Sequence, residues 1–227
     1  MAFGALVDHV DLWRLGDPAA VVFAVGGPPE EPALRLGLRR DDLWTRKRSP
    51  GMDDDSVAAE RADWDFVPCV RVGPLRFGMT PEEVRAALVD AVPRPSTHPW
   101  RLEFENPGLS TYFEEDLGLC AVALDAKRGP QVRIADFPVV GRPPSMVADL
   151  LVDYAVRNDM EGRITHEGDP AIEALGLVLR AQRSGDVLRT RPIFVRREWA
   201  PNAGDVVSGK LPKWEWYRRS YAADVGL

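Results

Sequence analysis

Cysteine and histidine are scarce in this sequence of 227 residues, which holds two of the first and three of the second. A secreted chain of this size usually carries several disulfides, so Cys69 and Cys120 are better explained as two buried thiols than as one bridge. Three histidines leave little material for general acid–base catalysis or metal binding.

Long apolar runs and catalytic motifs are missing as well. No apolar stretch approaches the roughly 20 residues that a membrane-spanning helix needs. Neither of the Gly-rich phosphate-loop patterns occurs, nor does the G-x-S-x-G turn of hydrolases. We therefore expect a chain that is not an enzyme, holds no cofactor or metal and has no membrane partner.

The sign of the net charge excludes a further class of function. Acidic residues outnumber basic ones, 35 to 29, which gives a net charge of −6. This is the wrong sign for sequence-independent binding to nucleic-acid phosphates, so we expect a basic protein as partner and no nucleic acid. Charged residues interrupt positions 1–25 and no cationic start precedes them, which is unlike a secretory signal. The expected location is the cytoplasm.

Residues 1–63 are predicted to form an N-terminal β-rich segment followed by a charged linker. The segment Ala19 to Val25 is apolar and stops at two glycines and two prolines, a strong turn signal. Blocks of alternating charge and few apolar residues fill positions 39–63, as in an exposed loop. Asp53 to Asp55 could hold a divalent cation, but a solvated loop is the simpler interpretation.

The clearest local signal is the start of a helix at Pro81. Thr80 and Glu83 have the spacing of a capping box, and proline suits the first helical position because its missing N–H costs nothing there. Apolar residues then recur with helical spacing, and Pro93 ends the pattern. The members of this apolar stripe are Val84, Ala87, Leu88 and Ala91.

Short alternating apolar runs follow this helix and predict an antiparallel meander. They are Leu102–Phe104, Thr111–Phe113, Gly118–Leu124 and Gln131–Ile134. A helix followed by strands predicts an α+β layer, in which the helix lies across one face of a small sheet.

The chain also resembles itself. At an offset of 63 residues, Gly78, Pro81, Val84 and Leu88 coincide with Gly141, Pro144, Val147 and Leu151. This predicts a second helix at about 144–154. At an offset of 58, the tripeptide around Gly118 coincides with the one around Gly176. The simplest interpretation is two tandem helix-plus-antiparallel-sheet units, at 64–137 and at 138–227 with an aromatic tail.

The segment Phe77 to Val84 contains a Gly-Met-Thr-x-x-Glu-Val helix start that resembles several bacterial families of small α+β modules. They include the outer-membrane assembly lipoprotein BamE, the tandem-module β-lactamase inhibitor proteins, and proteins suspected of being immunity proteins of toxin systems. In the last group a Tyr-Phe strand follows, here Tyr112-Phe113. The resemblance implies a non-catalytic module whose surface binds another protein. The signal peptide and lipidated cysteine of the lipoprotein are absent from this sequence.

Charged residues are unevenly distributed along the chain. One group of acidic residues has no basic residue between its members: Glu103, Glu105, Glu114, Glu115 and Asp116. It is either a solvated sheet edge or a face that selects a cationic protein. Six arginines surround Asp186 further along: Arg180, Arg183, Arg189, Arg191, Arg196 and Arg197. They form an exposed strand face, pair with the acidic group, or bind nucleic acid, which the net charge opposes.

Aromatic residues are concentrated near the C-terminus, at Trp214, Trp216 and Tyr217. The two tryptophans would share a face if this segment is a strand. They either pack in the core or form a docking element, because tryptophan, tyrosine and arginine are enriched at interface hot spots.

The leading hypothesis is a cytoplasmic immunity protein that inhibits a cognate, basic bacterial toxin through the acidic group and the aromatic tail. The alternative is an enzyme or small-ligand-binding protein with a pocket between the two units, using Glu114, Asp116 or His166. A third possibility is a structural subunit of a larger assembly. His166 to Asp169 offers three potential metal ligands, but a turn is the simpler interpretation.

Overall fold

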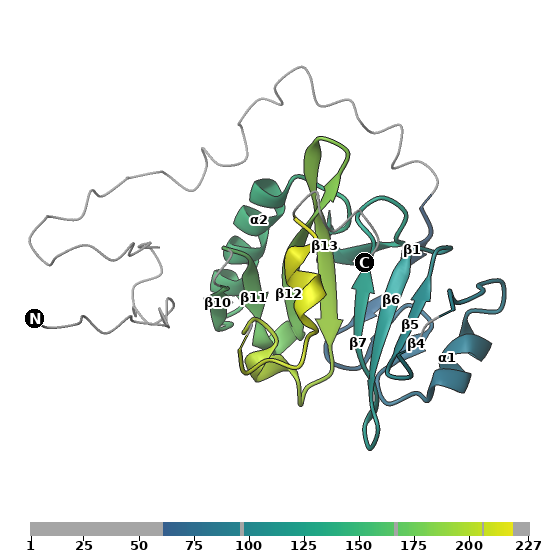
Figure 1. Ribbon diagram of the computed structural model, residues 1–227. Helices are drawn as coiled ribbons and strands as arrows, with labels where there is room; N and C mark the ends of the chain where they lie inside the picture. The colour runs from purple at the N-terminus through teal and green to yellow at the C-terminus, as the bar shows by residue number, and fades with distance from the viewer. Residues whose placement is uncertain (1–60, 96–97, 166–167, 206, 220–227) are drawn as a thin grey trace, which may run out of the picture.

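The computed structural model describes residues 61–95, 98–165, 168–205 and 207–219 (Figure 1). The predicted N-terminal β-rich lobe, apart from residues 61–63, lies outside the described residues. So do His166 and the end of the aromatic tail. Within the described ranges, no helix has the length and apolar character needed to cross a membrane.

A seven-stranded sheet organises the chain, and all its neighbouring strands are antiparallel. In spatial order its strands are β10 (Gly162–Ile164), β11 (Pro170–Ile172), β12 (Leu177–Ser184), β13 (Val187–Val195), β7 (Gly118–Leu124), β6 (Leu109–Glu114) and β5 (Arg101–Phe104). The predicted α+β class is confirmed, because helices pack against a sheet whose neighbouring strands are all antiparallel.

Two small three-stranded sheets accompany the large one. The first pairs β2 (Phe66–Val67), β3 (Arg71–Val72) and β4 (Leu75–Arg76); the second pairs β1 (Asp63–Trp64), β8 (Gln131–Ile134) and β9 (Phe137–Pro138). The helices are α1 (Pro81–Ala87), α2 (Pro144–Arg157) and α3 (Lys213–Tyr217), with 3-10 turns at Glu173–Leu175 and Ala200–Asn202.

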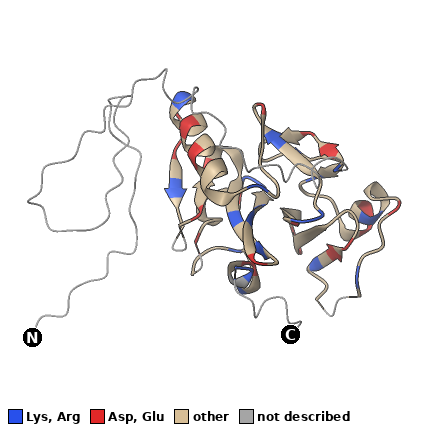
Figure 2. Cartoon of the chain, turned by 90° about the horizontal axis from the view of Figure 1, so that it is seen from above, with Lys and Arg blue, Asp and Glu red and all other residues tan. Residues whose placement is uncertain are grey.

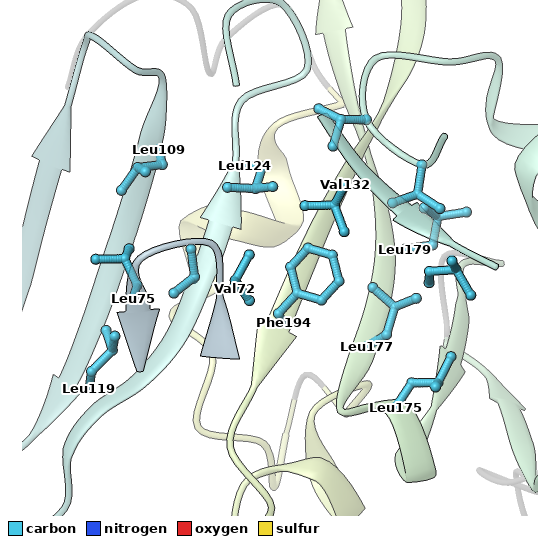
Figure 3. Packing of buried hydrophobic residues seen from close by; sticks show 14 of the residues in the cluster. Val72, Leu75, Leu109, Leu119, Leu124, Val132, Leu175, Leu177, Leu179 and Phe194 are labelled. Carbon is cyan, nitrogen blue, oxygen red and sulfur yellow. The ribbon is translucent and has the colours of Figure 1, made fainter. Parts of the chain in front are cut away.

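The large sheet is buried on both faces. On one face Leu177, Leu179 and Phe194 pack with apolar residues of α1, α2 and the small sheets (Figure 3). On the other face Val178 and Ile193 pack under the segment that leads to α3. Alternating side chains of β12 and β13 therefore supply two separate apolar clusters, as the period of two along a strand requires.

The capping box at the start of α1 is confirmed. The Thr80 N–H donates to the Glu83 carboxylate at 2.8 Å, and the Glu83 N–H donates to Thr80 Oγ1 at 3.2 Å. The helix ends at Ala87, one turn before the apolar stripe does. Pro93 disfavours helical backbone at the residue before it. The chain instead forms a turn, in which the Ala91 N–H donates to the Leu88 carbonyl.

The second helix also begins where the repeat places it, at Pro144, and continues to Arg157. Its Val147 and Leu151 are fully buried, as are the matching Val84 and, nearly so, Leu88 in the first unit. Pro143 stands in the N-cap position and no side chain caps this helix.

The predicted meander is wrong in its fourth strand. β5, β6 and β7 pair in sequence as expected, but β8 leaves the sheet and pairs with β1 and β9. β13 takes the place beside β7. Local alternation cannot distinguish these partners, because both candidate strands offer apolar faces and the choice depends on residues 60 or more positions apart.

Both predicted units thus contribute to one continuous sheet. Their element order agrees: α1 precedes the β5–β6–β7 meander and α2 precedes β10–β11–β12. Gly118 and the matching Gly176 both have left-handed backbone, with φ of 67° and 57°. These agreements support the proposed duplication, which stays a prediction.

Gly118 is expected to tolerate no side chain. A Cβ there would collide with the backbone carbonyl of Gly78, whereas one at Gly185, with a similar φ of 62°, would meet nothing within 4 Å. Gly185→Ala should lower the unfolding free energy by only about 1–2 kcal/mol, the strain of placing alanine in the left-handed conformation. Gly118→Ala should cost roughly 1–3 kcal/mol more, because backbone must shift. Urea unfolding of both variants measures the difference, and equal losses would contradict the argument.

Candidate protein-binding surface

Two arginines lie directly opposite each other at the centre of the sheet. Arg180 on β12 pairs in register with Arg191 on β13, and each residue is only 1% exposed. Like charges in such a pair repel, and an unpaired buried charge is costly. Each arginine therefore needs an acidic partner from outside the two strands.

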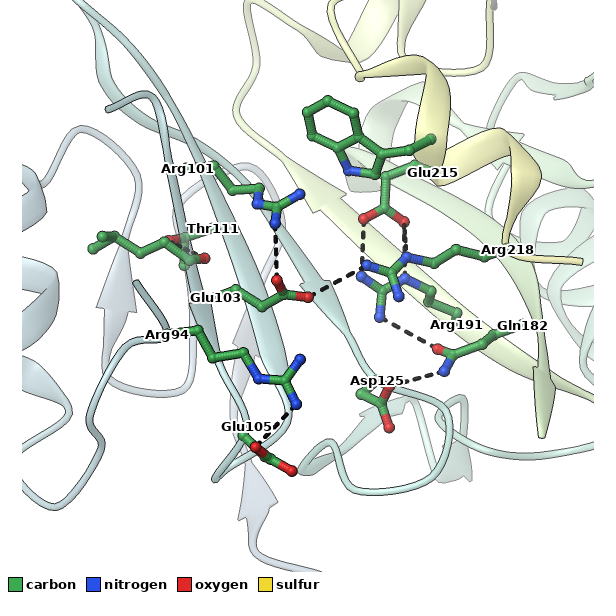
Figure 4. A network of polar contacts seen from close by, with 12 residues as sticks. Arg94, Arg101, Glu103, Glu105, Thr111, Asp125, Gln182, Arg191, Glu215 and Arg218 are labelled. Carbon is green, nitrogen blue, oxygen red and sulfur yellow. Dashed lines mark hydrogen bonds and ion pairs between the residues drawn. The ribbon is translucent and has the colours of Figure 1, made fainter. Parts of the chain in front are cut away.

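Glu215 of α3 neutralises Arg191. Its two carboxylate oxygens accept from the Arg191 guanidinium at 2.8 and 2.9 Å (Figure 4). The Tyr112 hydroxyl donates to the same carboxylate, and Arg218 Nε lies 3.4 Å from it. Burial alone would raise the pKa of Glu215, but Arg191 and Arg218 outweigh burial and hold that pKa well below its ordinary value.

Asp169 neutralises Arg180 and also forms an ion pair with Arg219. The Arg180 guanidinium further lies 4.0 Å from the centre of the Trp216 ring and donates to the Trp216 carbonyl at 3.1 Å. Both arginines thus hold α3 on the sheet. A helix of five residues is not stable on its own, so its position depends on these contacts.

The aromatic tail is helical, and the strand interpretation of it is wrong. Residues two apart on a helix point about 200° from each other, so Trp214 and Trp216 do not share a face. Trp216 is buried beneath α3 against Arg180. Trp214 is half-buried and contacts the sheet. The side chain of Tyr217 lies outside the described residues.

The rings of His98, Trp100 and Trp214 pack against one another, and we call this group the aromatic platform. His98 and Trp100 lie just before β5. The Trp100 and Trp214 centroids are 5.1 Å apart, and Arg101 lies 5.0 Å from the Trp214 ring centre. Trp214 Nε1 donates to the Tyr112 hydroxyl at 3.4 Å. Trp100 remains 36% exposed, so the platform presents a fixed aromatic surface to solvent.

The acidic group lies at two places rather than one. Glu103 is on β5, the edge strand of the sheet, and Glu105 directly follows that strand. Glu114 is four residues along β6 from the residue that pairs with Glu103, about 13 Å away. Figure 2 likewise shows acidic and basic residues interspersed along the chain.

Arginine and lysine side chains satisfy three of these five carboxylates. Glu103 pairs with Arg101 at 2.8 Å and with Arg218 at 3.6 Å. Glu105 accepts from Arg128 and Arg94, whose hydrogen bonds lower its pKa. Of the six arginines singled out in the sequence, Arg180 pairs with Asp169, Arg191 with Glu215 and Arg196 with Glu198.

Glu114, Glu115 and Asp116, which we call the acidic turn, connect β6 to β7. Glu114 accepts from Trp199 Nε1 and from Lys210, both at 2.9 Å, and these bonds lower its pKa. Glu115 and Asp116 are exposed, and no described residue forms an ion pair with either. The Phe113 N–H, next to this turn, donates to the Trp100 carbonyl at 2.8 Å, so the acidic turn borders the aromatic platform.

Other candidate residues have structural roles. Cys69 and Cys120 are both free and buried, as expected, and burial raises the pKa of each thiol. Asp169, considered as a metal ligand, binds two arginines. Across the described ranges, no group of three or more histidine, cysteine, aspartate or glutamate side chains gathers as a metal site.

Sequence reasoning missed the pairs that Arg180 and Arg191 form. A usable signal existed: Arg180 interrupts the apolar run Leu177 to Ala181, Arg191 directly precedes the apolar run Pro192 to Val195, and Glu215 stands between two tryptophans. Charged residues inside apolar segments are seldom buried without a partner. Which acid meets which arginine depends on the sheet order.

Glu215→Gln is expected to destabilise the protein by about 3–5 kcal/mol at pH 7, because it leaves Arg191 buried without its counter-charge. A carboxylate with a lowered pKa stabilises the fold above its unfolded pKa, ordinarily 4.5, and loses this contribution as pH falls. The unfolding free energy of the wild type should therefore approach that of the variant below about pH 4.5. Urea unfolding at pH 7, 5 and 3 measures this, with exposed Glu115→Gln as control. A difference in unfolding free energy between the wild type and Glu215→Gln that does not change with pH would contradict the ion pair between Glu215 and Arg191.

Comparison with known proteins adds no assignment: no family model, curated protein or solved structure matches this chain.

Proposed function

We propose that this chain is a non-catalytic protein-binding module, a cytoplasmic immunity protein that inhibits a cognate basic toxin through the aromatic platform and the acidic turn. The observation that carries the proposal is Trp100, one third exposed and held against Trp214. A tryptophan that is already ordered before binding loses little conformational entropy when a partner covers it.

The surroundings of Trp100 favour a cationic partner. An arginine or lysine of the partner can lie over the exposed face of the indole, as Arg101 already lies over Trp214. Glu115 and Asp116 add negative charge at the border of the platform. Such charges accelerate association with a basic protein and make it sensitive to salt.

The cysteines are consistent with the proposed cytoplasmic location. Both cysteines are free of a disulfide and buried, an arrangement that suits a reducing compartment. The membrane, nucleic acids and cofactors play no part in the proposed activity.

One cavity favours the second candidate, a small-ligand-binding protein. It measures about 390 Å³ and is lined by residues of both predicted units, among them Gln131 and Arg189. Neither Glu114 nor Asp116 is among its described lining residues, and His166, the third residue suggested for that function, lies outside the described residues.

Trp100→Ala is expected to abolish protection against the partner toxin and to weaken binding to it by tenfold or more, because a central aromatic anchor is lost. The toxin is first recovered with the tagged chain from native lysate at low salt and must kill cells when expressed alone. Co-expression with each variant then measures protection, and titration measures affinity.

The matched control is Val156→Ala, which removes an apolar side chain of similar exposure, 37%, from α2 on the other face of the sheet. Glu115→Gln with Asp116→Asn should slow association and reduce its salt dependence, whereas Asp149→Asn with Asp153→Asn on α2 should not. Full protection by Trp100→Ala, with folding verified by circular dichroism, would refute this surface. A chain that protects against no partner would refute the proposed function.

A further inference from the structure

The connection between α1 and β5 holds much of the exposed apolar surface of the described residues. Nine of their large apolar side chains are exposed, and three of these, Val89, Val92 and Trp100, fall between positions 89 and 100. Val89 is 86% exposed and Val92 is 84% exposed. Isolated exposed valines are ordinary, whereas neighbouring ones beside an aromatic anchor are typical of interaction sites. We call Val89, Asp90 and Val92 the valine turn.

The valine turn faces solvent because its neighbours face the core. Leu88 and Ala91 pack against the larger apolar cluster, which leaves the three residues of the valine turn on the solvent side. The Ala91 N–H donates to the Leu88 carbonyl at 2.9 Å. Further along, the Arg94 N–H donates to the Glu103 carbonyl of β5 at 2.7 Å. Both ends of the valine turn are therefore fixed to the fold.

This order in the free protein lowers the cost of binding. Pro93 and Pro95, directly after the valine turn, restrict the backbone that follows it. Valine is branched at Cβ, so its χ1 angle is restricted as well. Little conformational entropy is therefore lost when a partner covers Val89 and Val92.

Asp90 gives the valine turn a negative charge. Its side chain is exposed, and no described residue forms an ion pair with it. The arginines on either side are paired with other acids: Arg94 lies 2.9 Å from Glu105, and Arg85 lies 3.3 Å from Glu82. The valine turn therefore carries the same sign of charge as the acidic turn, and both are complementary to a basic protein.

One partner can cover both the valine turn and the aromatic platform. Trp100 directly precedes β5, and Phe104 at the other end of that strand forms a β-bridge with Pro93, which follows the valine turn. The four residues from Trp100 to Phe104 span about 13 Å. A protein interface of ordinary size covers roughly 800 Å² on each partner, which is wider than this separation.

We propose that the valine turn is a second contact area for the basic partner, and that it fits a protein face on which a lysine or arginine borders an apolar depression. This inference rests on the proposed function, because the same partner must cover Trp100. A competitor without the depression would leave both valines exposed, and one without the cation would leave Asp90 unpaired. The valine turn thus selects among basic proteins that Trp100 alone would accept.

The double variant Val89→Ser with Val92→Ser is expected to bind the toxin about tenfold or more weakly than the wild type, because it loses the apolar contact. Calorimetric titration of the full chain with the toxin recovered from lysate measures the affinity. The melting temperature should stay unchanged, since both side chains lie almost wholly outside the fold. Val187→Ser, which changes an exposed valine of the β12–β13 hairpin, should leave the affinity unchanged.

Asp90→Asn is expected to slow association at low salt and to match the wild type at high salt, because salt screens exposed charges. Stopped-flow mixing at two salt concentrations measures the rates. Asp136→Asn, which neutralises an exposed acid between β8 and β9, should have no effect at either concentration. The loss of affinity caused by the two serines should persist at high salt, because an apolar contact is not screened.

Failure of this inference is distinguishable from failure of the proposed function. If Trp100→Ala loses the toxin while the two serines leave its affinity unchanged, the valine turn has no such role and the proposed function stands. If the wild type binds no toxin, both fall together. Light scattering of the free chain tests a second copy as the occupant: a wild-type dimer that the two serines make monomeric would overturn the proposal.

Discussion

Arg180 and Arg191 lie side by side in the interior, and the C-terminal part of the molecule depends on how their charges are balanced. Two guanidinium groups on adjacent strands could not be buried together without counter-charges. Asp169, directly before β11, supplies one counter-charge, and Glu215 of α3 supplies the other. The ion pairs therefore fix a helix that is too short to persist alone.

The aromatic platform follows from this arrangement. Because Glu215 is bound to Arg191, the residue directly before it, Trp214, is held beside Tyr112 and Trp100. The same carboxylate accepts a hydrogen bond from the Tyr112 hydroxyl. Burial, and to a smaller extent the negative charge of Glu215, raises the pKa of Tyr112. A surface proposed for partner binding thus rests on a buried electrostatic network, and a rigid network presents a rigid surface.

The pairing of β7 with β13 joins the two halves into one sheet, and β8 pairs elsewhere. The connection from β7 to β8 then faces the β12–β13 hairpin across a cavity that Arg61 and Arg189 line. The aromatic platform and this cavity are built from different elements.

Features that depend on neighbouring residues can be predicted from the sequence. They are the capping box at Thr80 and Glu83, the starts of both helices, the first three strands of the meander and the two buried thiols, all of which follow from local hydrogen bonding and apolar spacing. Long-range packing, in contrast, selects the strand that lies beside β7, makes the tail helical, and brings Asp169 and Glu215 to the buried arginines. These outcomes depend on contacts between residues far apart in the chain, whose energies are set by burial and charge balance rather than by local pattern.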